Sequence, residues 1–152
     1  MRILIQRVKK ADVSVDGKCI GHIGQGILAF VGFAADDNIH MLKPMAEKMI
    51  GLRIFEDSDE KMNLSLSDIN GELLIVSQFT LYAGCAKGRR PSFSNAMNPV
   101  GAENMYNEFV RISQELCGAP VQTGSFGADM KVELLNDGPV TIMLDSDEIV
   151  KK

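Results

Sequence analysis

The chain has 152 residues, a formal net charge of −4 and an isoelectric point of about 5.2. Its hydrophobic share of 45% and charged share of 24% are those of a globular protein, which excludes intrinsic disorder and predicts one domain over residues 1–152. The acidic balance excludes a protein that grips nucleic acid along its phosphates over a wide surface, so any RNA contact is expected to be local.

The cysteines and the apolar runs indicate the compartment. Cys19, Cys85 and Cys117 are far apart and odd in number, which is typical of a reducing compartment and not of a disulfide framework. The first ten residues become charged too soon for a signal peptide, and no apolar run approaches the ~20 residues that span a bilayer. We therefore expect a cytoplasmic protein with no membrane partner.

The first part of the chain is expected to form four strands, over residues 2–8, 11–15, 19–23 and 27–33. In the second, Val13 and Val15 alternate with polar neighbours, which is the period of a half-buried strand. The third follows Asp16-Gly17, a dipeptide that accepts a tight hairpin turn. The fourth is a continuous apolar run, which is typical of a central strand.

The middle of the chain is expected to contain one helix and then more strand. Apolar residues recur at helical spacing over 39–50, and Pro44 requires that the helix either starts late, with Pro44 in its first turn, or kinks. Asn70-Gly71 is a second hairpin signal. The expected order is a strand over 53–55, a polar connection over 56–67, a buried strand over 72–81 and a long loop over 82–98.

A second helix is expected after this loop, with Asn98 as its N-cap, Pro99 at its first position and Gly118 at its end. Strands are then expected over 121–124, 131–135 and 140–144. The total is eight or nine strands and two helices. Because hairpin signals are frequent, we expect an α/β protein of the α+β type, with a mainly antiparallel, barrel-like sheet and two flanking helices.

Most standard catalytic sites are absent from the sequence. His22 and His40 have no second ligand at metal spacing, and neither a Gly-x-Ser-x-Gly elbow nor a Walker phosphate loop occurs. The glycines between positions 21 and 26 join strand to strand and are interpreted as a turn. We therefore expect no metal and no cofactor.

Two polar segments remain as candidates. In the first, Ser77 to Leu81 place polar side chains where an apolar strand enters the long loop, either as a plain strand end or as a pocket whose free N–H groups stabilise an oxyanion. The second, Asn136 to Thr141, is either a plain hairpin loop or a rigid surface with two adjacent carbonyls, since a Gly-Pro bond can be cis at modest cost.

Six separated segments carry a family resemblance: MRILIQRV, KMNLSLSD, VSQFTLYA, KGRRPSF, TGSFGADM and NDGPVT. In this order they resemble the bacterial and eukaryotic D-aminoacyl-tRNA deacylases over essentially the whole chain. The resemblance implies a β-barrel-like domain that works as a homodimer, with the active site at the dimer interface. It implies hydrolysis of the ester between a D-amino acid and the 3′ end of tRNA. The acidic isoelectric point and the lack of interleaved aromatic residues argue against a DNA partner.

The resemblance also assigns site residues. The expected catalytic residues at the pocket floor are Ser77, Gln78, Phe79 and Thr80. The expected selector of substrate chirality, inserted by the other subunit with a cis bond, is Gly138-Pro139. The expected supporting residues are Arg7, which orients the Gly-Pro loop, Phe126 and Met130, which line the pocket, and Asn136. The expected tRNA contacts are Lys87, Arg89 and Arg90, beside Gly84-Cys85-Ala86, where the family often has an aspartate.

The mechanism that follows is a hypothesis built on main-chain groups. N–H groups near Phe79 and Thr80 stabilise the oxyanion, and the 2′-hydroxyl of the terminal adenosine assists. Thr80 has no adjacent base, so it is expected to position the substrate rather than attack it. The carbonyls of Gly138-Pro139 reject an L side chain and admit D-amino acids and glycine. The alternatives are an editing enzyme of the same fold that removes L-alanine, a non-catalytic RNA-binding β-barrel and a small interaction domain.

Overall fold

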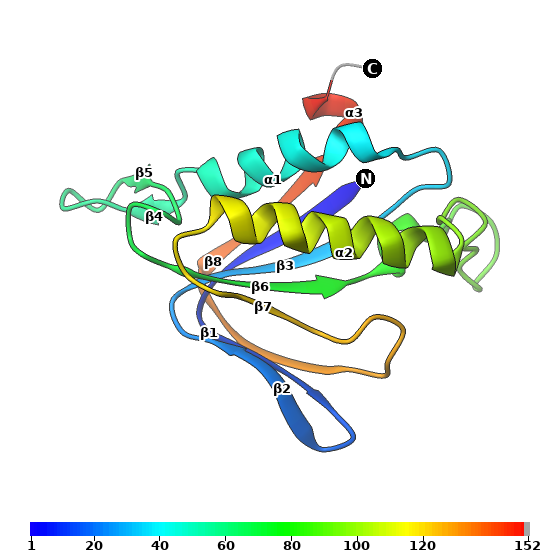
Figure 1. The fold of residues 1–152 in the computed structure, drawn as a ribbon, viewed down its shortest axis with the longest axis horizontal. Helices are drawn as coiled ribbons and strands as arrows, with labels where there is room; N and C mark the ends of the chain where they lie inside the picture. Colours follow the sequence, from blue (N-terminus) through cyan, green and yellow to red (C-terminus); the bar gives the residue numbers. More distant parts are fainter. Residues whose placement is uncertain (151–152) are drawn as a thin grey trace.

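One long strand, β1 (Arg2–Val15), organises the sheet in the computed structural model, which describes residues 1–150. On one edge β1 pairs antiparallel with β8 (Lys131–Asp145) along most of its length. On the other edge it pairs antiparallel with β3 (Gly26–Gly32) and then with β2 (Lys18–Ile23). Figure 1 shows β1 running through the molecule between these partners.

Two parallel strands extend the sheet beyond β3. β6 (Glu72–Ser77) pairs with β3, and β7 (Val121–Thr123) pairs with β6. Parallel neighbours require a crossover, and α1 (Leu42–Gly51) and α2 (Pro99–Leu116) lie in the two connections. The prediction of a barrel-like sheet in an α+β protein is confirmed, and the pairing around β1 is antiparallel as expected. The pairing of β3, β6 and β7 differs, because it is parallel.

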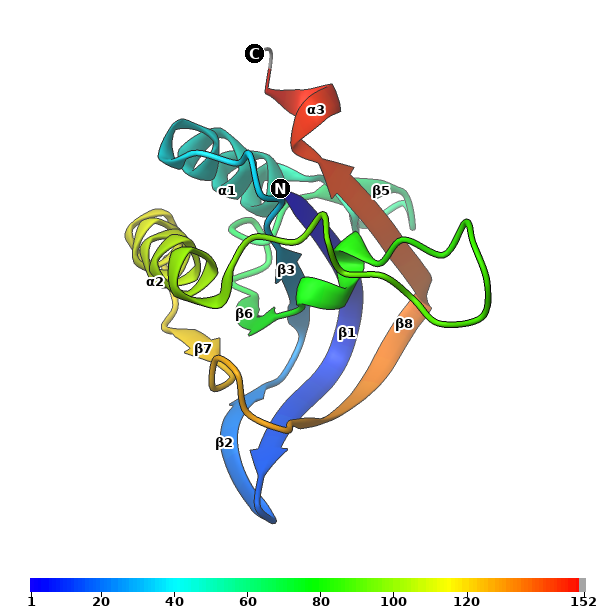
Figure 2. The same cartoon turned by 90° about the vertical axis from the view of Figure 1, so that its right-hand side faces the viewer.

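The sheet buries a different core on each of its faces. The helices α1 and α2 lie side by side over one face and cover the larger core, to which Ile3 and Ile5 of β1 belong. The sheet curls around a second core, to which Val8, Ala11 and Val13 of the same strand belong. Figure 2 shows this curl, with the helices on one side of the sheet only.

Both long helices begin as their sequences direct. A 3₁₀ turn, η1 (Ile39–Met41), precedes α1, so the helix starts late and Pro44 lies in its first turn, where its missing N–H leaves no bond unmade. At α2 the Asn98 side chain accepts a hydrogen bond from the N–H of Gly101 at 2.9 Å, and Pro99 takes the first position. None of the helices within residues 1–150 is long and apolar enough to cross a membrane.

Several predicted boundaries are wrong. The two strands expected over 2–8 and 11–15 form one strand, and so do those expected over 131–135 and 140–144. No hairpin forms at Asn136 to Pro139, because β8 pairs with β1 on both sides of this segment and the register shift between Gln6 and Val8 accommodates its extra residues.

Other corrections concern short elements. The strand expected over 72–81 ends at Ser77 and is followed by a 3₁₀ helix, η2 (Phe79–Tyr82). The connection expected over 56–67 contains β5 (Met62–Leu64), which pairs with β4 (Phe55–Glu56). A third α-helix, α3 (Ser146–Ile149), ends the described chain, where two helices were expected.

Candidate functional site

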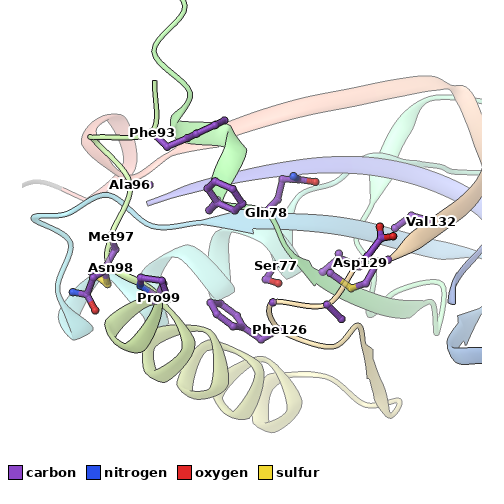
Figure 3. A pocket seen from close by; sticks show the side chains of 16 residues that line it. Ser77, Gln78, Phe93, Ala96, Met97, Asn98, Pro99, Phe126, Asp129 and Val132 are labelled. Atoms are coloured by element: carbon purple, nitrogen blue, oxygen red, sulfur yellow. The ribbon is translucent and has the colours of Figure 1, made fainter. Parts of the chain in front are cut away.

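A cavity of about 650 Å³ opens at the end of β6, where the chain continues into η2. Three segments surround it: the end of β6 with the start of η2, the end of the long loop with the start of α2, and the loop before β8 (Figure 3). The lining residues are Val76, Ser77, Gln78, Phe79, Phe93, Ala96, Met97, Asn98, Pro99, Ala102, Phe126, Gly127, Ala128, Asp129, Met130 and Val132. Five of the residues expected at the site are therefore brought together: Ser77, Gln78, Phe79, Phe126 and Met130.

The floor of the cavity is a strand end that turns into η2. The N–H of Gln78 donates to the carbonyl of Val31 at 2.7 Å, which ties the turn to β3. The Gln78 side-chain amide donates to the Thr80 hydroxyl, and Thr80 itself is exposed and lies outside the cavity lining. Within residues 1–150 the N–H groups of Phe79 and Thr80 donate to no other protein group, because they open the 3₁₀ helix.

Phe126 is positioned by the helix α2. The ring of Tyr106 lies 5.8 Å from that of Phe126, centroid to centroid, and the Tyr106 hydroxyl donates to the buried carbonyl of Ile75 at 2.7 Å. Burial raises the pKa of this tyrosine, so it stays a neutral donor. The N–H of Gly124 donates to the same carbonyl at 3.2 Å, so β6, α2 and the Phe126 loop share one anchor.

Sequence reasoning missed the wall formed by the end of the long loop. Phe93 contacts Phe79 edge-on at 4.9 Å between ring centroids, and Met97, Asn98 and Pro99 complete this side. The sequence predicts Asn98 and Pro99 only as the start of a helix. The one available signal is Phe93, an aromatic residue among the polar residues in the middle of the loop.

The chemistry of the lining is limited. No histidine, cysteine or lysine belongs to it, and its one carboxylate, Asp129, is exposed and paired with Lys131 at 2.9 Å. Among the described residues no group of three or more side chains that ligate metals is found. What the cavity offers a substrate is an apolar wall, hydroxyl and amide side chains, and free main-chain N–H groups.

The Gly138-Pro139 dipeptide lies elsewhere on the chain. Both residues are exposed, and the peptide bond between them is cis. Asn136 and Thr141 pair with Val8 and Gln6, so Gly138 lies beside Arg7 of β1. Through Ile27 of β3, Arg7 is in line with Leu73 of β6, and Ser77 lies four residues further along β6. With about 3.3 Å per residue and about 4.8 Å between strands, this puts Gly138 roughly 20 Å from Ser77 of the same chain, measured along the sheet.

Two side chains hold the dipeptide from behind. Arg7, only 5% exposed, donates from Nε to the carbonyl of Asp137 at 2.9 Å and from Nη1 to that of Ile54 at 2.7 Å. The Asn136 Oδ1 accepts the N–H of Val140 at 3.1 Å and so spans the dipeptide. Its Nδ2 donates to the hydroxyl of Thr141 at 3.0 Å.

Gly138 can only be glycine in this arrangement. Its φ is +130°, a conformation that residues with a side chain rarely adopt. A Cβ there would lie 2.9 Å from Nη2 of Arg7. The arginine therefore packs directly against the α-carbon of the exposed dipeptide.

The expected tRNA contacts lie in the long loop and do not line the cavity. Lys87, Arg89 and Arg90 are all exposed. Gly84 and Ser92 exchange two main-chain hydrogen bonds, of 2.7 and 2.9 Å, which close the base of the loop that carries the basic residues.

Comparison with known sequences gives close relatives over the full length. The family described as D-Tyr-tRNA(Tyr) deacylase matches residues 4–145. The D-aminoacyl-tRNA deacylase of Thermosipho africanus is 56% identical over 149 residues, which are 98% of this chain and 99% of that protein. The D-aminoacyl-tRNA deacylase of Clostridioides difficile is 55% identical over 146 residues, which are 96% of this chain and 97% of that protein.

Solved structures agree in fold. The c-Myc DNA Unwinding Element Binding Protein superimposes with a TM-score of 0.91 at 40% identity, over 96% of this chain and 99% of that chain. A probable eukaryotic D-amino acid tRNA deacylase superimposes with a TM-score of 0.80 at 20% identity, over 94% and 97%, which is a likeness of fold alone. Because the family match spans nearly the whole sequence and the relatives share more than half of its residues, the chain belongs to the D-Tyr-tRNA(Tyr) deacylase family.

Proposed function

We propose that this chain hydrolyses the ester bond of D-aminoacyl-tRNA and releases the D-amino acid and the tRNA. The observation that carries the proposal is the strand end at the cavity floor: where it turns into η2, the N–H groups of Phe79 and Thr80 are free, and Phe79 lines the cavity. Such donors suit the oxyanion that forms when water attacks an ester carbonyl. The relatives named above as D-aminoacyl-tRNA deacylases supply the substrate class.

The proposed chemistry uses no side-chain nucleophile. Thr80 has its hydroxyl bound by Gln78, and no histidine, lysine or cysteine lines the cavity to serve as its base. Water attacks the carbonyl carbon, the oxyanion is held by main-chain N–H groups, and the 2′-hydroxyl of the terminal adenosine assists. The ester C–O bond then breaks, and the 3′ oxygen of the tRNA leaves as a hydroxyl after taking up the proton from the attacking water.

We propose that two copies of the chain complete each other's sites. Gly138-Pro139 points outward and lies roughly 20 Å from the cavity of its own chain, by the strand spacings given above. Leu4, Phe30 and Met143 are neighbours in the sheet on the face that the helices leave open, and Met143 is 47% exposed. An apolar face of this kind suits a second copy, which would place its dipeptide in this cavity.

The dipeptide is proposed to sense the handedness of the substrate. Its carbonyl groups would lie against the α-carbon of the amino acid, where an L side chain collides with them and a D side chain points away. Glycine has no side chain to reject, so glycine mischarged on tRNA(Ala) is also expected to be a substrate. The basic residues Lys87, Arg89 and Arg90 are proposed to contact tRNA phosphates.

The test is release of amino acid from charged tRNA by the purified chain. We expect hydrolysis of D-Tyr-tRNA and Gly-tRNA(Ala), and slow or no hydrolysis of L-Tyr-tRNA. Equal rates on D-Tyr-tRNA and L-Tyr-tRNA would refute chirality sensing, and preferential cleavage of L-Ala-tRNA would identify an L-alanine editing enzyme instead. Binding of tRNA without release would show a non-catalytic protein.

A second pair of measurements separates the roles in the reaction. Thr80→Ala is expected to retain hydrolysis, because the threonine positions the substrate and does not attack it. A substrate ending in 2′-deoxyadenosine is expected to react much more slowly. If Thr80→Ala lost all activity and the unmodified enzyme formed a covalent intermediate, Thr80 would be the nucleophile.

A further inference from the structure

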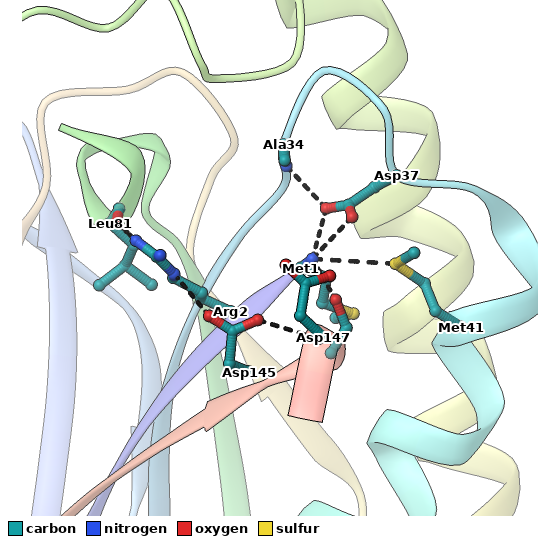
Figure 4. A network of polar contacts seen from close by, with 9 residues as sticks. Met1, Arg2, Ala34, Asp37, Met41, Leu81, Asp145 and Asp147 are labelled. Atoms are coloured by element: carbon teal, nitrogen blue, oxygen red, sulfur yellow. Dashed lines mark hydrogen bonds and ion pairs between the residues drawn. The ribbon is translucent and has the colours of Figure 1, made fainter. Parts of the chain in front are cut away.

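The carboxyl end of η2 is held from outside by the first strand. Nη1 of Arg2, in β1, donates to the carbonyl of Leu81 at 3.0 Å. The guanidinium carbon of Arg2 also lies 4.7 Å from the ring centroid of Tyr82. Figure 4 shows Arg2 between Leu81 on one side and Asp145 on the other.

Arg2 is itself fixed by the end of β8. Its Nε donates to Oδ2 of Asp145 at 2.9 Å, and the strand pairing sets the two residues opposite each other. The second oxygen of Asp145 accepts the N–H of Asp147 at 3.0 Å and caps α3. Hydrogen bonding to Asp145 raises the pKa of Arg2 further above its ordinary value. An arginine is always charged in a protein, so both of its bonds are charge-assisted.

Besides Arg2, packing on β3 holds the far end of η2, because a Cβ built at Gly32 would lie 3.2 Å from Cβ of Leu81 and 3.5 Å from Cδ2 of Tyr82. At its start, the N–H of Gln78 is bound to β3. Single 3₁₀ turns hold its main chain, including the bond from the N–H of Leu81 to the carbonyl of Gln78 and that from the N–H of Ala83 to the carbonyl of Thr80, and so short a 3₁₀ helix is weak alone. Within residues 1–150, Arg2 provides the one side-chain hydrogen bond to the main chain of η2, and an exposed loop follows.

We propose that Arg2 is a positioning residue for the deacylation: it fixes η2 so that the N–H groups of Phe79 and Thr80 keep their direction toward the substrate oxyanion. The inference rests on the proposed function and adds to it a residue outside the cavity. Without this bond and ring contact the far end of η2 tilts, and the two donors move away from the position of the oxyanion. Displacements of about 1 Å in a reacting site cost about 100-fold in rate.

The kinetic test compares Arg2→Met, which keeps the apolar stem, with Arg2→Lys, which keeps the charge. Lys18→Met, at an exposed position on β2, is the matched control for loss of a surface cation. With D-Tyr-tRNA we expect kcat of Arg2→Met to fall about 10- to 100-fold while KM stays within about twofold. Arg2→Lys is expected to recover part of kcat, Lys18→Met to match the wild type, and the D-over-L preference to persist in all three.

A second measurement does not depend on activity. Hydrogen exchange of the Leu81 and Ala83 amides reports the opening of η2, and we expect it to be about tenfold faster in Arg2→Met and unchanged in Lys18→Met. Thermal unfolding confirms that each variant is folded. A merely structural Arg2 would lower the unfolding temperature and leave the kcat of the folded enzyme unchanged.

The outcomes separate this inference from the proposed function. An active wild type with an unchanged kcat or unchanged amide exchange in Arg2→Met overturns the positioning role and leaves the deacylase proposal standing. A wild type that does not hydrolyse D-Tyr-tRNA overturns both. Lower kcat, constant KM and faster exchange together, with partial rescue by lysine, support the inference.

Discussion

Arg7 is a buried cation whose closest partners are carbonyl groups and not carboxylates. The nearest carboxylate oxygens, of Asp137 and Glu56, lie 3.5 and 4.0 Å away, whereas the carbonyls of Asp137 and Ile54 lie at 2.9 and 2.7 Å. A guanidinium suits this task because its planar fork fixes two acceptors at once, which an ammonium does not. The exposed dipeptide is thus placed by a side chain from the neighbouring strand.

Asn136 is expected to act on substrate selection through the same dipeptide. Asn136→Ala removes the acceptor of the Val140 N–H and the donor to Thr141, so the dipeptide becomes free to move. We expect the rate on L-Tyr-tRNA relative to D-Tyr-tRNA to rise about tenfold, the equivalent of one lost hydrogen bond. Asn104→Ala, at an exposed position on α2, is the control. An unchanged ratio of the L-Tyr-tRNA and D-Tyr-tRNA rates in Asn136→Ala would show that Asn136 does not hold the dipeptide for substrate selection.

Ser113 is a buried residue for which removal should help. Its side chain in α2 is fully buried, and within the described chain its hydroxyl has no hydrogen-bond partner. Ser113→Ala removes a desolvated hydroxyl and improves helix propensity, so we expect the unfolding temperature to rise by about 2–4 °C, equivalent to ~1 kcal/mol. The exposed Ser67→Ala should change little, and clear destabilisation of Ser113→Ala would contradict this account.

The residues of the site could be predicted only in part from sequence. Ser77, Gln78 and Phe79 stand at a strand end with unusual polarity, and the family resemblance singled them out. Phe93 and Asn98 were not found, because a loop of irregular conformation has no period from which its path can be read. Their place in the cavity depends on where α2 packs, which is a tertiary property.

In the continuous strand β8, pairing with β1 overrides a local preference for a turn. Asn136, Asp137, Gly138 and Pro139 are all turn formers, and a hairpin was the plain expectation. The partner strand β1 continues past them, so the chain keeps its direction and the extra residues form a bulge. A bulge bends its strand and changes the direction in which the bulged residues point. Here the bulged residues include the exposed dipeptide Gly138-Pro139.

The end of β6 shows the opposite error. Phe79 to Leu81 favour strand and are predicted as its end, yet they belong to η2. The neighbouring strand β3 ends at Gly32, so the sheet offers no partner beyond that point. Without a partner strand, the main chain of these residues forms its hydrogen bonds within a 3₁₀ turn instead.

Gly32→Ala should disturb this turn directly. A Cβ at Gly32 would lie 2.6 Å from the carbonyl of Gln78, a main-chain atom that can only shift together with η2. We expect kcat with D-Tyr-tRNA to fall about 10- to 100-fold. Gly51→Ala is the matched control, since a Cβ there meets nothing within 4 Å, and equal activity of the two variants would disprove the coupling.

At the scale of the molecule, the fold class follows from the sequence and the closure of the sheet does not. Hairpin signals at Asp16-Gly17 and the apolar run of β3 identify a sheet protein with helices. The parallel pairing of β3, β6 and β7 joins residues far apart in the chain, and no local pattern encodes which strands meet. Hydrophobic periodicity likewise gives no information on the proposed second copy.

Association of two chains can be tested on the face that the helices leave open. Met143→Lys places a charge beside Leu4, and burying it against a second copy would cost about 3 kcal/mol or more, or about 100-fold in the dimer constant. Sedimentation should show monomers, and hydrolysis of D-Tyr-tRNA should fall with the dimer. Ile20→Lys, an equally exposed apolar position on β2, is the control. An active monomeric Met143→Lys would rule out shared sites.

The groups proposed to act on the substrate, the amides at 79 and 80 and the carbonyls at 138 and 139, belong to the polypeptide backbone. Mutation replaces side chains and leaves peptide groups in place, unless it introduces a proline or moves the chain. Inactivating substitutions should therefore occur mainly at positions that determine the backbone conformation, such as Gly32, Arg7 and Gly138. The side chains of the cavity wall should tolerate substitution better. A survey of viable substitutions at every position would display that contrast.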